Sequence, residues 1–289
     1  MTASGRRTSV WSVSSSTAQL LSFLPRLRAR TPHMVDDLAT LVACESPPDD
    51  PPAMAACGEL VADLGSDLFG LSAERIDAGG SQQLIWRGGG PTSVLLVGHF
   101  GAVRPGGTVA GRPFSVDGDR ATGAGVLDKA GLVQMLYALS VLDDLTAVTM
   151  IVLPALTLSR VDTRGALQRE ARGARAVLIG DPGESVTAHG AATQVFELAR
   201  TLARRIGLPE LRLASARPGS PLLIPADLGP PTLAGLGADG ARDAHGEWAS
   251  VGAMSNRSAL LAALIASVRT DGFVAADQGP GETSAGSTM

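Results

Sequence analysis

The sequence of 289 residues predicts an α/β fold of three layers, with helices on both faces of a mixed, mostly parallel sheet. Continuous apolar runs at VLLVG (94–98), VTMIVLPAL (148–156) and AVLIG (176–180) are typical of parallel strands that are buried on both faces. Segments in which apolar residues recur with helical spacing separate these runs. A hydrophobic content of 45% is ample for the core of such a domain.

The remaining elements follow from the same patterns. The predicted helices are 34–44, 53–71, 131–144, 164–174, 194–208 and 255–272, and a further short strand is predicted at 84–86. The proline-rich segment 45–52 separates the first two helices, and Gly207 and Pro209 end the fifth helix. The glycine-rich segment 104–131 is predicted to be a loop that leads into the third helix.

We expect one domain over residues 32–270, between a mobile N-terminal extension (1–31) and a disordered tail (271–289) that is rich in Gly, Ser and Thr. The extension contains arginines and a serine run but no acidic residue, and its apolar piece AQLLSFL is short and has no convincing cleavage site. It is therefore not interpreted as a secretion signal, although Arg6 and Arg7 leave a twin-arginine interpretation open.

Composition narrows the expected partners and location. Net charge is −4 and aromatic residues are few and scattered, so we expect no nucleic-acid partner. No apolar run approaches the about 18 residues of a membrane span, so we expect no membrane partner. Cys44 and Cys57 form neither a metal-binding pattern nor a disulfide framework, and a reducing cytoplasm is the expected location. A single lysine, Lys129, beside abundant Arg, Ala and Gly is typical of a high-GC bacterial genome.

Three polar residues lie where the predicted strands and loops end. His99 follows the strand VLLVG, Asp181 follows the strand AVLIG, and Asp128 lies between the glycine-rich loop and a helix. Ligands of open α/β sheets bind beyond the carboxyl ends of the strands, and imidazole and carboxylate groups are ordinary zinc ligands. The ordinary alternatives are a structural histidine at 99, a helix cap at 128 and a turn at 181.

Four segments carry a resemblance to a known family, and they occur in the family's order. They are SVLLVGHFGAVRPGGT, RPFSVDGDRATGAGVLDKAGLV, RGALQREARGARAVLIGDPG and PPTLAGLGADGARDAHGEW. Over about residues 35–268 the chain resembles the M20 family of dinuclear zinc peptidases and amidohydrolases. The resemblance implies a zinc-exopeptidase-like fold with one zinc ion bound by His99, Asp128 and Asp181, and a second metal bound by Asp128 and His245. Two such metals polarise a carbonyl and generate hydroxide near neutral pH.

The sequence departs from the family in several places. Gly101 stands where the family has an aspartate that orients the metal ligands. The family's acidic pair, a general base and a ligand of the second metal, falls on Leu156 and Thr157, which can play neither part. The segment SVTAHGAATQVFELA (185–199) runs almost directly into a helix, so the family's lid or dimerisation domain is expected to be absent. We therefore do not expect the lid-mediated dimer of the family.

These departures favour a protein that has lost ordinary peptidase activity, with no catalytic residue assigned and a binding, scaffold or regulatory role. Its partner would be another protein or a peptide-like ligand. The alternative is a hydrolase or amidohydrolase with one zinc ion on His99, Asp128 and Asp181, acting on a peptide or amide in a bacterial biosynthetic pathway. In that case Glu184 or Glu247 is the candidate for a substitute base. His245, with most of its partners lost, is as readily interpreted as an ordinary loop histidine.

Overall fold

The computed structural model describes residues 17–47, 49–77, 82–101, 106–154, 161–183, 185–189, 192–214, 229–243 and 246–270, with the backbone alone for 161–164, 189 and 243. The helices are α1 (Thr17–Ala29), α2 (Thr31–Ala43), α3 (Pro51–Phe69), α4 (Thr108–Gly111), α5 (Val126–Ser140), α6 (Val161–Ala171), α7 (Thr193–Arg205) and α8 (Val251–Thr270). The strands are β1 (Glu74–Asp77), β2 (Gln82–Arg87), β3 (Val94–His99), β4 (Ser115–Asp117), β5 (Arg120–Thr122), β6 (Val148–Leu153), β7 (Ala176–Ile179), β8 (Val186–His189), β9 (Leu213–Ala214), β10 (Thr232–Ala234), β11 (Gly240–Asp243) and β12 (Gly246–Ser250).

The main sheet has eight strands in the order β1-β2-β6-β3-β7-β10-β8-β9. Strands β6, β3, β7 and β10 are parallel neighbours, whereas β1, β2 and β8 join the sheet through antiparallel pairs. The three apolar runs of the sequence form the parallel strands β6, β3 and β7, as predicted, and the structure places these strands side by side. Their carboxyl ends meet at one edge, where His99 pairs in register with Leu153.

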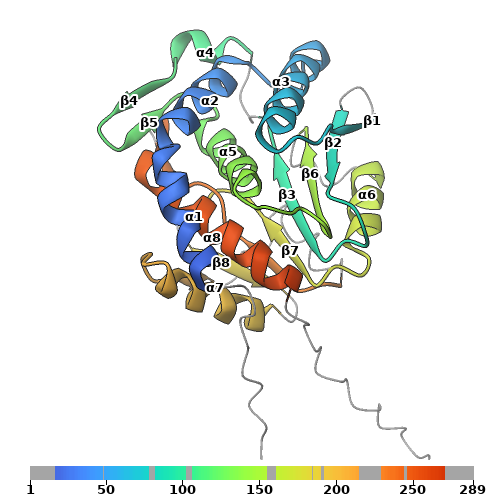
Figure 1. Cartoon of the computed structure of the whole chain (residues 1–289). Helices are drawn as coiled ribbons and strands as arrows, with labels where there is room; N and C mark the ends of the chain where they lie inside the picture. Colours follow the sequence, from blue (N-terminus) through green and yellow to red (C-terminus); the bar gives the residue numbers. More distant parts are fainter. Residues whose placement is uncertain are drawn as a thin grey trace, which may run out of the picture.

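Helices cover the two faces of this sheet unequally. Side chains alternate along β3, so that Leu96 joins a large buried cluster and Leu95 joins a smaller one on the opposite face. The large cluster collects residues from α1, α2, α3, α5, α7 and α8, whereas α6 covers the other face through Leu167 and Ala171 (Figure 1). The three-layer arrangement predicted from the sequence is thus confirmed, with one layer much thicker than the other.

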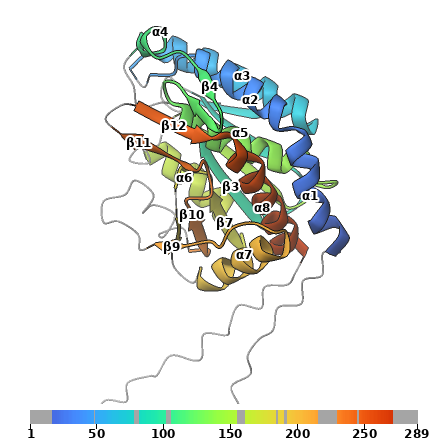
Figure 2. The same cartoon turned by 90° about the vertical axis from the view of Figure 1, so that its left-hand side faces the viewer.

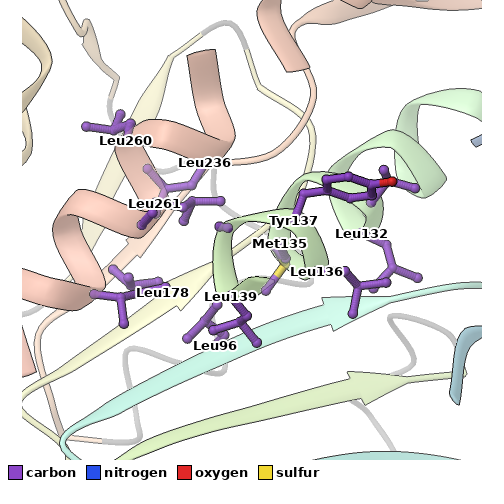
Figure 3. Close-up of a cluster of buried hydrophobic side chains, with 14 of the residues drawn as sticks. Leu96, Leu132, Met135, Leu136, Tyr137, Leu139, Leu178, Leu236, Leu260 and Leu261 are labelled. Atoms are coloured by element: carbon purple, nitrogen blue, oxygen red, sulfur yellow. The ribbon is translucent and has the colours of Figure 1, made fainter. Parts of the chain in front are cut away.

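Helix α5 lies at the centre of the thick layer. All its residues from Val126 to Leu139 are buried, as is typical of a helix that neighbours surround on every side. Figure 3 shows part of the surrounding cluster, which includes Leu96, Leu132, Met135, Leu136, Leu139, Leu178, Leu260 and Leu261. Packing against the sheet, α2, α3 and α8 fixes the first turn of α5 beside the edge where β3 ends.

The sequence predicted a mobile extension over residues 1–31, but the structure shows that residues 17–31 belong to the folded domain. They form α1 and the start of α2, and α1 packs along α8. Leu20, Phe23, Leu24 and Leu27 are buried in this contact. The reason is their spacing, which puts all four on one face of the helix.

Among the described residues, α8 is the one helix long and apolar enough to cross a membrane by length and composition. The expectation that no apolar run approaches that length is therefore wrong for α8. The helix packs against α1, α5 and α7, and 72% of its apolar window is buried inside the structure. These contacts account for its apolar composition as that of a core helix.

A second, smaller sheet was not predicted. Strands β11, β12, β5 and β4 form an antiparallel sheet in that order, although the sequence indicated only a glycine-rich loop over 104–131. Figure 2 shows this sheet at one end of the molecule together with α4. Strand β12 packs against α5, which brings residues 240–250 next to the start of that helix.

No lid interrupts the connection from β7 to α7. Residues 180–192 form that connection, and within it β8 pairs with β10 in the main sheet. The connection is therefore part of the sheet rather than the stem of an inserted domain.

Candidate functional site

His99 is the last residue of β3 and is 4% exposed. Its Nδ1 donates a hydrogen bond to the backbone oxygen of Gly101 at 3.4 Å, and its Nε2 lies 3.8 Å from Oδ1 of Asp128. Nε2 is buried and has no hydrogen-bond partner among the described residues. Burial lowers the pKa of His99, and the Asp128 charge opposes this effect only in part. A neutral imidazole with its proton on Nδ1 leaves a lone pair on Nε2, facing the carboxylate.

Asp128 lies in the first turn of α5 but does not cap the helix. The N-cap residue is Gly125, which has a left-handed φ of 73° and, as a glycine, no side chain that could cap the helix. Asp128 is therefore not the N-cap residue, although it lies in the first turn, where a helix favours a negative charge. The Asp128 carboxylate turns toward the edge of the sheet, with Oδ1 toward His99 and Oδ2 toward Arg242. The helix N-terminus stabilises a negative charge there.

Asp181 is the second residue after β7 and is 6% exposed. Its Oδ1 accepts a hydrogen bond of 2.6 Å from the backbone N–H of Gly235. Burial raises the pKa of Asp181 to about 7, and the charge of Asp128 adds to the rise. Gly180 lets α5 come close at this point, because a Cβ there would lie 2.0 Å from Sδ of Met135. The fold thus brings Asp181 to the same edge as His99 and Asp128.

The described part of the chain contains no three His, Cys, Asp or Glu side chains that are grouped closely enough to hold a metal ion. The donor types at this edge nevertheless suit one zinc ion, since an imidazole and two carboxylates are available. The unpartnered Nε2 of His99 is the atom that such an ion would engage. The donor atoms of these residues are therefore of the right type for a single zinc ion, but the side chains are too far apart to form a complete set of ligands.

Arg242, on β11, was not recognised from the sequence. Its guanidinium lies 3.1 Å from Oδ2 of Asp128 and 3.0 Å from Oε2 of Glu247, and half of the side chain is exposed. The resemblance implies that Asp128 shares a second metal with His245. In this structure a fixed cation of the chain occupies the oxygen through which Asp128 would do so. The second metal therefore does not fit.

Glu247, on β12, was a candidate for a substitute base. Its side chain is 2% exposed, with Oε1 accepting from the backbone N–H of Gly125 at 2.8 Å and Oε2 accepting from Arg242. A carboxylate held by two donors in this way stabilises the start of α5 and the position of Arg242. This arrangement does not favour proton abstraction by Glu247, because both oxygens already accept hydrogen bonds.

Gly101 has a structural requirement that the sequence did not reveal. A Cβ at this position would lie 1.9 Å from the backbone oxygen of Pro154. An aspartate in the family's position cannot be accommodated on this backbone. The backbone oxygen of Gly101, rather than an aspartate, orients the His99 ring through Nδ1.

The other residues singled out in the sequence lie outside the described residues. They are His245, Leu156, Thr157 and Glu184.

The single lysine serves a structural contact beside the site. Lys129 is buried, and its Nζ donates to the backbone oxygens of Leu41 at 2.7 Å and Cys44 at 2.5 Å. It thereby fastens α5 to the end of α2. Both cysteines are free, and the pKa of Cys44 is lowered by the hydrogen bond from Cys57, with a smaller contribution from Lys129.

Comparison with known proteins defines the class of this domain by its fold. The structure is similar to aminopeptidase PepT from Bacillus cereus, with a TM-score of 0.65 and 16% identity over 83% of this chain and 99% of that one. It is similar to a tripeptidase from Staphylococcus aureus, with a TM-score of 0.61 and 13% identity over 82% and 98%. It is also similar to the M20 family metallo-carboxypeptidase Sso-CP2 from Sulfolobus solfataricus, with a TM-score of 0.59 and 8% identity over 81% and 99%.

No protein-family profile matches the sequence, and no curated protein matches it. The fold is thus that of an M20-type metallopeptidase catalytic domain, as the sequence resemblance indicated.

Proposed function

We propose that this protein is a divergent M20-like domain that has lost ordinary two-metal peptidase chemistry and binds a peptide-like ligand or a protein at the carboxyl edge of its sheet. The contact of Arg242 with Asp128 carries the proposal. Two-metal hydrolysis needs a carboxylate whose two oxygens are free to bridge the ions. Here one oxygen already pairs with a cation of the chain.

Displacing Arg242 would be costly as well. Glu247 is buried, and it would lose the cation that faces Oε2. A buried acceptor left without a partner costs on the order of 1–3 kcal/mol, and water at the half-exposed Arg242 reduces this figure. A metal ion would have to offset that cost before it could bind Asp128 through Oδ2.

Features of the sequence support the same proposal. Leu156 and Thr157, at the family's acidic pair, provide neither a base nor a ligand for a second metal. The low net charge and the scarcity of aromatic residues favour a peptide or protein partner over a nucleic acid. We also propose a cytoplasmic setting, because the two cysteines form no disulfide framework, and a bacterial source, because a single lysine stands beside abundant Arg, Ala and Gly.

The test is a peptidase assay on unlabelled di- and tripeptides, with the full chain and zero, one or two equivalents of zinc. We expect no hydrolysis above that of free zinc at the same concentration. Hydrolysis that depends on the protein and is abolished in His99→Ala would overturn the proposal. An exposed arginine on α7 offers the matched control, because Arg204→Ala leaves this edge of the sheet intact.

A second candidate is a hydrolase with one zinc ion, and the unpartnered Nε2 of His99 favours it. His99, Asp128 and Asp181 would hold the ion, which supplies a polarised carbonyl and an acidified water when bound. Metal content measured by mass spectrometry, on protein purified without a metal column, tests this candidate. About one zinc per chain, lost in His99→Ala, supports it, whereas a chain that takes up no zinc excludes it.

A further inference from the structure

A pocket of about 300 Å³ lies on the small sheet, separate from the edge where β3 ends. Its wall includes two arginines, Arg112 after α4 and Arg120 on β5, together with Trp248 and Glu247 of β12. Strands β12 and β4 lie near α4 at one end of the molecule, as Figure 2 shows. None of these residues was singled out for this purpose from the sequence.

Both arginines are exposed, and the contacts that the described residues make with them are not ion pairs. The guanidinium of Arg120 lies 4.3 Å from the centroid of the Trp248 ring, which fixes its plane by a cation–π contact. The backbone oxygen of Arg112 accepts a hydrogen bond from Ala124, just before α5 begins. A Cβ at Gly246 would lie 3.4 Å from Nη1 of Arg112, so the guanidinium reaches over the start of β12.

Among the described side chains, neither arginine forms an ion pair with a carboxylate. Arginines on the main sheet behave differently, since Arg75 pairs with Glu59 and Arg87 pairs with Glu170. Two guanidinium groups that line one pocket, with no carboxylate partner among the described side chains, favour a positive potential there. The two arginines in one pocket are the observation that points to a ligand.

Glu247 does not cancel this potential. Its charge is already met by Arg242 on Oε2 and by the backbone N–H of Gly125 on Oε1. Glu247 therefore forms one wall of the pocket and one side of the Arg242–Asp128 contact at the same time. A ligand in the pocket would lie beside Glu247, which Arg242 connects to Asp128.

We infer that this pocket binds the carboxylate group of a small ligand or of a peptide C-terminus, between Arg112 and Arg120. The planar fork of a guanidinium matches a carboxylate, and two forks can hold both its oxygens. The volume suits the end group of a ligand, being at the lower limit of small-molecule sites. Phosphate is the competing anion, and the experiment below distinguishes it from a carboxylate.

The inference rests on the proposed binding role, for which it names the chemical class of ligand. The two can fail separately. The experiment below measures carboxylate binding without zinc, whereas the test of the proposed function measures hydrolysis.

The experiment follows the indole N–H signal of Trp248 by ¹H–¹⁵N NMR of the full chain in EDTA, with Trp248→Phe to assign the signal. The probes are N-acetyl-trialanine with a free carboxylate, the same peptide as its C-terminal amide, glutarate, and inorganic phosphate. We expect a saturable shift with the free acid and with glutarate, and at least tenfold weaker binding of the amide. Arg112→Gln and Arg120→Gln remove the guanidinium and its charge but keep a polar side chain, and each should weaken binding of the free acid at least tenfold, whereas Arg204→Gln should not.

Three results would overturn the inference. One is equal binding of the free acid and the amide, because the carboxylate would then make no difference. Another is tighter binding of phosphate than of either carboxylate probe. The third is that the free acid binds Arg112→Gln and Arg120→Gln as tightly as it binds the unchanged protein, or that it gives no saturable shift at all.

Discussion

Nη2 of Arg242 lies 3.1 Å from Oδ2 of Asp128, and the same nitrogen lies 3.0 Å from Oε2 of Glu247. One guanidinium from the small sheet thus holds a carboxylate of α5 and a buried carboxylate of its own sheet. In a two-metal site the position beside Asp128 would belong to an exchangeable ion. Here it is occupied by a guanidinium of the chain itself.

Arg242→Ala is therefore expected to lower the free energy of unfolding, by on the order of 1–3 kcal/mol, because the buried Glu247 loses its cation. Urea unfolding followed by circular dichroism measures this change. Arg204→Ala, exposed on α7, is the control and is expected to stay within about 0.5 kcal/mol of the unchanged protein. Equal stability of the two variants would show that the contact is not maintained in solution.

The same variant is also expected to bind zinc more tightly, by at least about tenfold, which corresponds to about 1.4 kcal/mol. The reason is that Oδ2 of Asp128 becomes free to coordinate. Isothermal titration of zinc into Arg242→Ala and into the unchanged protein gives the comparison. Unchanged zinc affinity would contradict the view that Arg242 competes with a metal for Asp128.

Restoring the family's aspartate at position 101 is expected to destabilise the fold. A Cβ at Gly101 would lie 1.9 Å from the backbone oxygen of Pro154, so Gly101→Ala must move the ends of β3 and β6 apart. We expect Gly101→Ala to lower the free energy of unfolding by about 3 kcal/mol, at the upper end of the usual cost of overpacking, and Gly101→Asp to lower it further.

Thermal and urea unfolding test this prediction. Gly111→Ala is the matched control, since a Cβ there meets nothing within 4 Å. If Gly101→Asp folds as stably as this control, then the position can accept the aspartate and its absence has no steric cause.

The sequence predicted the main sheet because its central strands are continuous apolar runs, a signal that depends only on local composition. The placement of His99 and Asp181 at one edge followed from that sheet. The small sheet could not be predicted in the same way. Strands β4 and β5 have three residues each, and all three residues of β4 are exposed. They pair with each other, and β5 joins the sheet by pairing with β12, more than a hundred residues away.

Arg242 was missed for the same reason, since its partners are defined only when β11 pairs with β12 and β12 packs on α5. Helix α1 is a different case. The spacing of Leu20, Phe23, Leu24 and Leu27 is a helical apolar stripe that was present in the sequence. The nearby arginines and the serine run indicated a mobile extension instead. Steric requirements such as that of Gly101 leave no mark in a single sequence.

Helix α1 should contribute strongly to stability. Phe23 is fully buried against the core, and Phe23→Ala is expected to lower the free energy of unfolding by about 3–5 kcal/mol. Leu21 lies on the outer face of the same helix and is 48% exposed. Leu21→Ala should therefore lower the free energy of unfolding by no more than about 0.5 kcal/mol. Urea unfolding of the two variants tests the packing of α1, and equal effects would contradict it.

The raised pKa of Asp181 gives the protein a defined pH dependence in the absence of metal. In the folded state burial raises this pKa to about 7, whereas an unfolded aspartate has a pKa of about 3.9. Between these values the folded chain binds more protons than the unfolded chain. Stability therefore falls as pH rises from about 4 to about 7, by at most about 1.4 kcal/mol per pH unit from this group.

Asp181→Asn isolates this contribution, because an amide oxygen can still accept the hydrogen bond from Gly235 but does not titrate. In EDTA, the stability of Asp181→Asn relative to the unchanged protein is expected to rise from about pH 4 to about pH 7 and then to level off. Asp117→Asn, which removes an exposed carboxylate of β4, should give a much flatter difference. A flat curve for Asp181→Asn as well would mean that Asp181 is ionised throughout this range, and that water or a bound cation stabilises its charge at the end of β7.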